Sequence, residues 1–185
     1  MTGESTATLR DALVSLRGDA GLGGEDASRW VRTRIGPIPF AYPNTRGRKR
    51  VLAAHDLHHI LAGYGTDLLG EAELAAWELG SGLRDRSAVR YAIRVFGFMV
   101  PRRWSRLRSA FVRGRHSRNL ADRALDGEAL QRTVEEMRRE LGLADPTPSA
   151  NGEDLRAFRA WAAKGVAIVW GPLIPIALAI GWWLR

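Results

Sequence analysis

The stretch HDLHH, residues 55–59, is followed by eleven residues and then Glu71, and the chain is organised around it. Three of the four histidines in the sequence lie within these five positions. Residues four apart lie on one face of an α-helix, so His55 and His59 project from the same face one turn apart. Asp56 borders that face. The pattern therefore predicts two imidazoles and a carboxylate close together on one helix.

The residues after the motif predict a turn and a second helix. Gly63 and Gly65 interrupt the helical pattern, and Asp67 is a suitable N-cap for a helix over residues 68–79. Glu71 then falls in the first turn of that second helix. Because helices joined by a tight turn pack side by side, we expect Glu71 to face back toward the histidines.

Imidazoles and carboxylates in this arrangement predict a divalent metal site with His55, Asp56, His59 and Glu71 as its ligands. HExxH metalloproteases use the same histidine spacing, but their general base is Glu, one methylene longer than the Asp found here. This difference argues against a peptidase. The alternative is a helix that carries surface histidines. His58 lies about 100° round the helix from its neighbours, which predicts a supporting or surface position.

Residues 50–80, RVLAAHDLHHILAGYGTDLLGEAELAAWELG, resemble the core of the Coq4 family of ubiquinone-biosynthesis proteins. The family motif is HDxxH, eleven residues and then E, within a longer pattern of the type HDLxHxLxGYxTDxxGE. This chain matches it at His55, Asp56, His59, Gly63, Thr66, Asp67, Gly70 and Glu71. Residues 113–115 and 135–142 resemble later conserved stretches, so the resemblance covers roughly residues 40–144.

This resemblance implies a mostly helical protein with a divalent metal, zinc being the expected ion. It also implies a membrane-associated polyprenyl substrate and a role in making ubiquinone (coenzyme Q). Family members are tied to removal of the C1 carboxylate from a polyprenylated 4-hydroxybenzoate-type precursor, and to holding the other quinone-biosynthesis proteins together.

Composition and charge restrict the partners. The chain of 185 residues has no cysteine, which excludes disulfides and thiolate metal sites. Its net charge of +8 is carried almost wholly by arginine, which favours an anionic partner such as a membrane surface. No nucleic-acid-binding motif accompanies the charge, so we expect no nucleic acid partner.

The expected fold class is all-α: a compact helical domain followed by a C-terminal hydrophobic helix. We expect a variable arm over residues 1–34, a helical domain over 35–144, a linker and short helix over 145–163, and a membrane anchor over 164–185. The arm has a weak helical stripe over residues 7–16. Residues 35–43 contain three prolines, which predicts an extended or turning segment that lines a pocket mouth, contacts lipid or forms a surface connection.

Further helices follow from apolar patterns. Residues 89–100 predict a buried helix that ends at Pro101, and Trp77 is predicted to lie in the core. Residues 102–118 alternate arginines with apolar side chains, which is typical of a helix on anionic lipid or of one with a solvated arginine face. Residues 127–141 predict an amphipathic helix with a period near 3.6.

Residues 165–184, GVAIVWGPLIPIALAIGWWL, carry no charge over twenty positions. At about 1.5 Å per residue this length suits a transmembrane helix, and its tryptophans suit the membrane interface. Its two prolines favour a kink, and the alternatives are a core helix or a re-entrant hairpin. Basic residues precede the segment and no signal peptide is visible. We therefore expect the catalytic domain on the cytoplasmic side of a bacterial inner membrane.

The leading functional prediction is a metal-dependent carbon–carbon lyase of ubiquinone biosynthesis, with Asp56 and Glu71 as catalytic residues. Its expected partners are the polyprenyl quinone precursor, membrane lipid and other quinone-biosynthesis proteins, with a homodimer as a further possibility. One alternative is a non-catalytic lipid-binding organiser of quinone enzymes. Another is a metal-dependent lipid hydrolase, for which the short Asp56 is a poor base.

Overall fold

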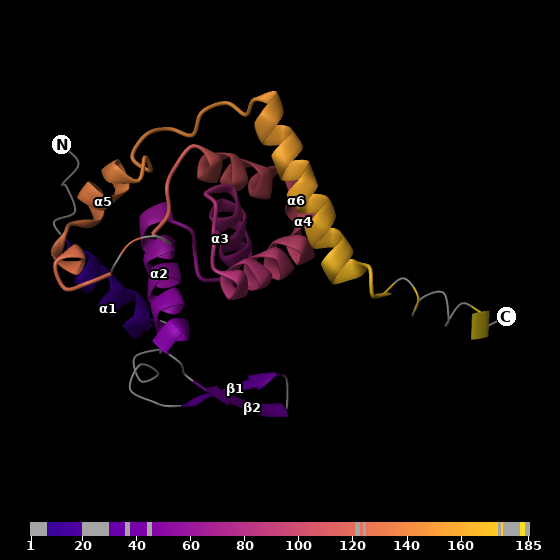
Figure 1. Cartoon of the computed structure of the whole chain (residues 1–185), viewed down its shortest axis with the longest axis horizontal. Coiled ribbons are helices and arrows are strands. Elements are labelled where there is room, and N and C mark those ends of the chain that lie inside the picture. Colours follow the sequence, from indigo (N-terminus) through magenta and orange to yellow (C-terminus); the bar gives the residue numbers. More distant parts are fainter. Residues whose placement is uncertain are drawn as a thin grey trace. The chain divides into compact units, whose positions relative to one another are not determined.

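The computed structural model describes residues 7–19, 30–35, 38–43, 46–120, 123, 125–173, 175 and 182–183, and of residues 19, 30–35, 38–43 and 46–51 the backbone alone. The elements are α1 (Leu9–Asp19), β1 (Trp30–Ile35), β2 (Ile38–Pro43), α2 (Arg46–Ala62), α3 (Leu68–Gly80), α4 (Arg86–Arg115), the 3₁₀ turn η1 (Ala129–Gln131), α5 (Val134–Glu140) and α6 (Gly152–Trp170). Figure 1 shows them in chain order. The predicted helical fold is confirmed, with a small two-stranded sheet in addition.

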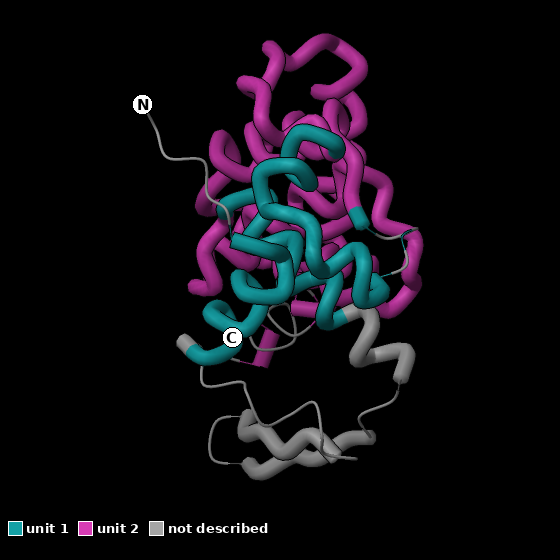
Figure 2. Tube along the Cα trace, turned by 90° about the vertical axis from the view of Figure 1, so that its left-hand side faces the viewer, with its two compact units in different colours: residues 1–63, 120–140 teal, residues 64–119, 141–185 magenta. Residues whose placement is uncertain are grey.

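The chain divides into two compact units, which Figure 2 shows in teal and magenta. Unit 1 comprises residues 1–63 and 120–140, and unit 2 comprises residues 64–119 and 141–185.

In unit 1, α1 contacts α2 and η1, and α2 contacts α5. Backbone hydrogen bonds tie the start of α1 to the segment before α5: the Leu9 N–H donates to the Arg132 carbonyl (2.9 Å), and the Val134 N–H donates to the Ala7 carbonyl (3.1 Å). Leu9 is fully buried. The weak helical stripe in residues 7–16 therefore belongs to a docked helix.

The proline-rich segment forms a hairpin. β1 and β2 pair antiparallel, with Trp30 opposite Pro43 and Ile35 opposite Ile38. The prediction of an extended segment over residues 35–43 is confirmed for the backbone of residues 35 and 38–43. The predicted contact of this segment with a pocket or lipid concerns side chains outside those described.

Unit 2 is built on α4, which packs against both α3 and α6 (Figure 1). Its core includes Phe96, Phe111 and Phe158, and the Phe158 ring contacts both of the others edge-on. α3 and α4 approach closely because glycines lie where they cross. A Cβ on Gly114 would stand 2.2 Å from the Trp77 carbonyl oxygen, so only glycine fits there. Trp77 is buried in the core, as predicted.

α4 consists of two helical stretches joined across a kink, where Arg103 has non-helical angles (φ −133°, ψ 35°). The first stretch therefore ends close to Pro101, as predicted. Proline removes one backbone donor, and a helix packed on both sides tolerates that loss as a kink. The apolar side of the helix that was predicted to face lipid or solvent packs inside the protein. Leu107, Phe111 and Val112 are buried in the protein itself, so the arginines between them form the outer face.

The helix predicted over residues 127–141 is shorter than expected. The segment makes a 3₁₀ turn over Ala129–Gln131, and α5 begins only at Val134. Thr133 and Glu136 explain the late start. The Glu136 N–H donates to the Thr133 hydroxyl (3.2 Å), and the Thr133 N–H donates to the Glu136 carboxylate (2.9 Å). This reciprocal capping box fixes the first turn of α5.

The C-terminal region also differs from the prediction. α6 runs without a break from Gly152 to Trp170, so the expected short helix and the start of the expected anchor are one helix. Its N-terminus carries a capping box made by Asn151 and Asp154. Among the residues that the structure describes, no helix combines the length and the apolar character needed to cross a bilayer. Residues 174, 176–181, 184 and 185 of the expected anchor lie outside the described residues.

Candidate metal centre

The motif histidines lie in the last turns of α2, which ends as the sequence predicts. Gly63 follows the helix with a positive φ of 74°, a conformation that glycine adopts at little cost. Its N–H donates to the His59 carbonyl (2.9 Å). Asp67 then caps α3, its carboxylate accepting from the Gly70 N–H (2.7 Å). Glu71 is therefore fixed in the first turn of α3.

Among the described residues, His55, His59 and Glu71 are the candidate ligands of a metal ion. The two histidines lie on α2, in unit 1, and Glu71 lies on α3, in unit 2. The imidazole rings of His55 and His59 meet edge to face, with centroids 4.9 Å apart and an interplanar angle of 87°. The i, i+4 spacing thus produces neighbouring rings, as predicted.

The chemistry of this ligand set fits a divalent metal. Two imidazole nitrogens and one carboxylate match the protein ligands of many catalytic zinc sites, which keep a fourth position for water or substrate. The same two-histidine, one-carboxylate set also suits Fe(II).

Asp56, the fourth predicted ligand, is not part of this group. Its carboxylate accepts from the Arg17 guanidinium at 3.0 Å and is 7% exposed. Arg17 lies on α1 and Asp56 on α2, so the pair fastens these two helices of unit 1. Asp56 follows His55 in the helix and therefore projects about 100° away from it. Sequence spacing did not identify Arg17 as its partner, because the two residues are 39 positions apart.

His58 has a supporting role. Its side chain is 1% exposed, and its Nε2 accepts from the Leu120 backbone N–H at 3.0 Å. The prediction of a surface position is wrong, and the supporting position is the one found. His58 therefore holds the chain at Leu120 against α2.

Glu71 has a hydrogen-bond partner that the sequence did not reveal. The Tyr91 hydroxyl, on α4, donates to the Glu71 carboxylate at 3.4 Å. Burial raises the pKa of Tyr91 to about 12, and the charge of Glu71 adds to the shift. Tyr91 is therefore a neutral donor at pH 7. A hydrogen bond to the second oxygen of a ligating carboxylate is a common way to orient it.

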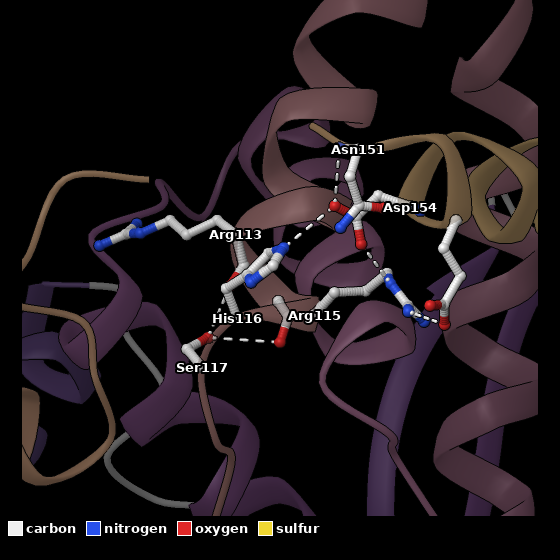
Figure 3. A network of polar contacts seen from close by, with 8 residues as sticks. Arg113, Arg115, His116, Ser117, Asn151 and Asp154 are labelled. Atoms are coloured by element: carbon white, nitrogen blue, oxygen red, sulfur yellow. Dashed lines mark hydrogen bonds and ion pairs between the residues drawn. The ribbon is translucent and has the colours of Figure 1, made fainter. Parts of the chain in front are cut away.

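The fourth histidine of the chain belongs to a separate network (Figure 3). His116 and Arg115, at the end of α4, point at Asp154 on α6, with distances of 3.0 Å and 2.6 Å. Asp154 is 1% exposed. Burial raises its pKa, but the hydrogen bonds from His116, Arg115 and Asn151 outweigh it and lower the pKa to about 2. The Arg115 guanidinium pairs with the Asp154 carboxylate, so this network fastens α6 to α4.

The chain matches no protein-family model, and it matches no curated protein and no solved structure. The functional argument therefore rests on the motif residues and their geometry.

Proposed function

We propose that this protein takes part in ubiquinone biosynthesis, as a metal-dependent decarboxylase of a polyprenylated 4-hydroxybenzoate-type precursor at the membrane. The observation that carries the proposal is the ligand set itself: two imidazoles on α2 whose ring centroids lie 4.9 Å apart, and the Glu71 carboxylate in the first turn of α3. These are three of the residues on which the resemblance to the ubiquinone-biosynthesis family rests.

The three side chains would hold the ion, with zinc as the expected metal. When bound, the metal supplies Lewis-acid polarisation of the ring oxygen or the carboxylate. Three protein ligands leave room for a substrate group in the fourth position. Tyr91 holds the Glu71 carboxylate in one orientation through its hydroxyl. Asp56, tied to Arg17, positions α2 and so the two histidines.

The reaction balances without an added oxidant or reductant. A proton adds to the ring carbon that bears the carboxylate, which interrupts the aromatic system. The bond between that carbon and the carboxylate then breaks, carbon dioxide leaves, and the electron pair of the bond restores aromaticity. We take water as the proton source, because the Asp56 carboxylate is already engaged by the Arg17 guanidinium.

The charge of the chain agrees with an anionic substrate drawn from a membrane. The precursor carries a carboxylate on a ring and a polyprenyl tail that stays in the bilayer. A net charge of +8 raises the local concentration of anions near the protein. We propose that the protein works at the cytoplasmic side of the membrane, together with other quinone-biosynthesis proteins.

The test is the lipid content of cells that lack the gene, compared with cells that carry it back intact or as Glu71→Ala. Prenylated ring compounds are measured by mass spectrometry. We expect a carboxylated precursor to accumulate without the gene and to disappear only with the intact form. A Glu128→Ala form, altered at an exposed carboxylate outside the stretches that resemble the family, is the matched control and should restore the pathway.

Two outcomes contradict the proposal. Full rescue by Glu71→Ala would favour an organiser of quinone enzymes that does not use its metal. An unchanged lipid profile in the cells that lack the gene would remove the ubiquinone pathway altogether, and another lipid substrate would have to be sought.

A further inference from the structure

Large apolar side chains are exposed together on one face of unit 2. Leu68 at the start of α3, Phe98 on α4 and Ile168 on α6 are 56%, 39% and 43% exposed. They surround an open groove of about 360 Å³, which is lined by Leu68, Arg94, Val95, Phe98, Ile168 and Val169. Five of these six lining side chains are apolar and the sixth is a guanidinium. We call this surface the groove face.

The groove face has a rigid aromatic edge. The rings of Phe98 and Trp170 stack with centroids 5.6 Å apart and an interplanar angle of 9°. The Trp170 indole N–H donates to the Gly97 carbonyl at 3.1 Å, which fixes the ring against α4. The Arg102 guanidinium lies over both rings, 5.3 Å from the Phe98 centroid and 5.4 Å from that of Trp170. Cation and aromatic groups therefore share one surface.

The parts of α4 and α6 that form most of this face carry only positive charges, and the nearest acid on α3 is Glu71, one turn from Leu68. α4 contains no Asp or Glu, and α6 has none after Asp154. Arg94 lies at the groove itself, and Arg102 lies at its aromatic edge. An apolar surface bordered by cations, with no acid on the contributing stretches of α4 and α6, is complementary to an anionic lipid surface.

We propose that the groove face is the surface by which this protein binds an anionic lipid bilayer. Leu68, Phe98 and Ile168 enter the boundary between headgroups and acyl chains, and Arg94 and Arg102 contact the headgroup phosphates. A second copy of the chain is a poorer occupant. A two-fold interface through this face would bring the arginines of one copy against those of the other.

This inference goes beyond the proposed enzymatic function and does not depend on it, because a bilayer contact needs neither the metal nor the reaction. The groove face and the candidate ligand Glu71 nevertheless lie close together in sequence and structure. Leu68 and Glu71 lie in the same turn of α3, and Tyr91, which contacts Glu71, precedes Arg94 by one turn of α4. Docking through the groove face would place Glu71 near the bilayer surface.

The experiment is co-sedimentation of the purified protein with two kinds of vesicle, phosphatidylcholine alone and phosphatidylcholine mixed with phosphatidylglycerol. We expect tighter binding to the mixed vesicles, weakened by added salt. Ile168→Asp and Arg94→Glu should each reduce that binding roughly ten-fold, because each removes or reverses an interfacial contribution.

The matched controls lie on α1, in the other unit. Val14→Asp alters an apolar side chain that is 67% exposed, and Arg10→Glu reverses an exposed arginine. Both should bind like the unaltered protein. Circular dichroism checks that all four variants are folded, and sedimentation velocity without lipid measures their oligomeric state.

Binding that is unchanged by both groove-face variants overturns the proposal, and so does equal loss in the α1 controls. If the groove-face variants instead convert a dimer to a monomer without lipid, the face joins two copies and the proposal is also overturned. Failure of the enzymatic proposal is distinguishable, because it appears in the cellular lipid profile of the Glu71→Ala form and leaves vesicle binding intact.

Discussion

His58 and His59 are neighbours on α2, but their side chains meet different atoms. His58 accepts a hydrogen bond from the Leu120 N–H, and His59 belongs to the candidate metal group. A rotation of about 100° between successive helical residues is enough to separate a structural histidine from a ligand.

Substitution of these two residues should therefore affect different properties, namely stability for His58 and metal binding for His59. His58→Ala leaves the buried Leu120 N–H without its partner and opens a cavity. We therefore expect the free energy of unfolding to fall by roughly 2 kcal/mol. The variant that remains folded should still bind metal. His59→Ala should lose most metal binding. Urea unfolding and metal analysis of both proteins check the pair, and a reversed pattern would contradict the assignment.

Asp154 gives a second prediction at the residue scale, on pH. Its pKa is lowered from 3.8 to about 2 in the folded protein. A lowered pKa stabilises the fold above pH 4, where the unfolded carboxyl is also ionised, and that contribution is lost as the pH falls from about 4 to about 2. It amounts to on the order of 2 kcal/mol.

Asp154→Asn should remove this contribution at pH 7 and flatten the acid limb of the stability curve. Glu153→Gln is the control, because Glu153 pairs with the same Arg115 from a largely exposed position. Urea unfolding between pH 2 and pH 7 measures both. An unchanged acid limb in Asp154→Asn would show that the network does not stabilise the fold.

At the same scale, the candidate ligand residues could be predicted from the sequence, but the hydrogen-bond partners of Asp56 and Glu71 could not. The spacing of His55, His59 and Glu71 follows from helical periodicity and one turn, so the sequence contains it. Arg17 and Tyr91 come from other helices, 39 and 20 residues from their partners. No local pattern joins residues that far apart, so only the tertiary structure identifies these contacts.

Helix ends are the features in which prediction and structure differ most at the scale of elements. The sequence placed α3 correctly, because Gly63 and Asp67 mark the turn and the cap. It started α5 too early, although Thr133 and Glu136 have the spacing of a capping box. It also divided α6, because the change from polar to apolar residues near Gly165 resembled a boundary. A change in hydropathy does not end a helix whose backbone hydrogen bonds continue.

The cap of α6 is testable. The Asn151 side chain accepts from the Asp154 N–H at 2.9 Å. Asn151→Ala should lower the free energy of unfolding by about 1 kcal/mol, whereas Asn151→Ser should keep most of it, because serine is also a good N-cap. Thermal unfolding followed by circular dichroism compares the two. Equal loss in both variants would mean that the cap hydrogen bond is not the cause.

At the scale of the whole molecule, a metal that binds only the folded chain must stabilise it. With free zinc at about a hundred times its dissociation constant, the gain is about 2.7 kcal/mol. For a chain of 185 residues this corresponds to a rise in Tm of roughly 5–10 °C. Glu71→Ala should show little of that rise. Differential scanning calorimetry with and without zinc measures it, and a similar rise in both proteins would place the zinc elsewhere.

The helical class could be predicted for the whole molecule, because apolar periodicity specifies which faces are buried. The arrangement in two units could not. It depends on the segment at residues 120–140 returning to α1 and α2, through contacts such as the Leu9 N–H with the Arg132 carbonyl. Such backbone pairing leaves no mark in the side-chain pattern.

The central claim is that His55, His59 and Glu71 hold a metal, and the most direct test is the metal content of the purified protein. Inductively coupled plasma mass spectrometry compares the unaltered protein with Glu71→Ala and with the control Glu128→Ala. We predict about one zinc ion per chain in the unaltered protein and in the control, and less than about a tenth of that in Glu71→Ala. Equal metal content in all three proteins, or none in any of them after zinc is supplied, would contradict the account.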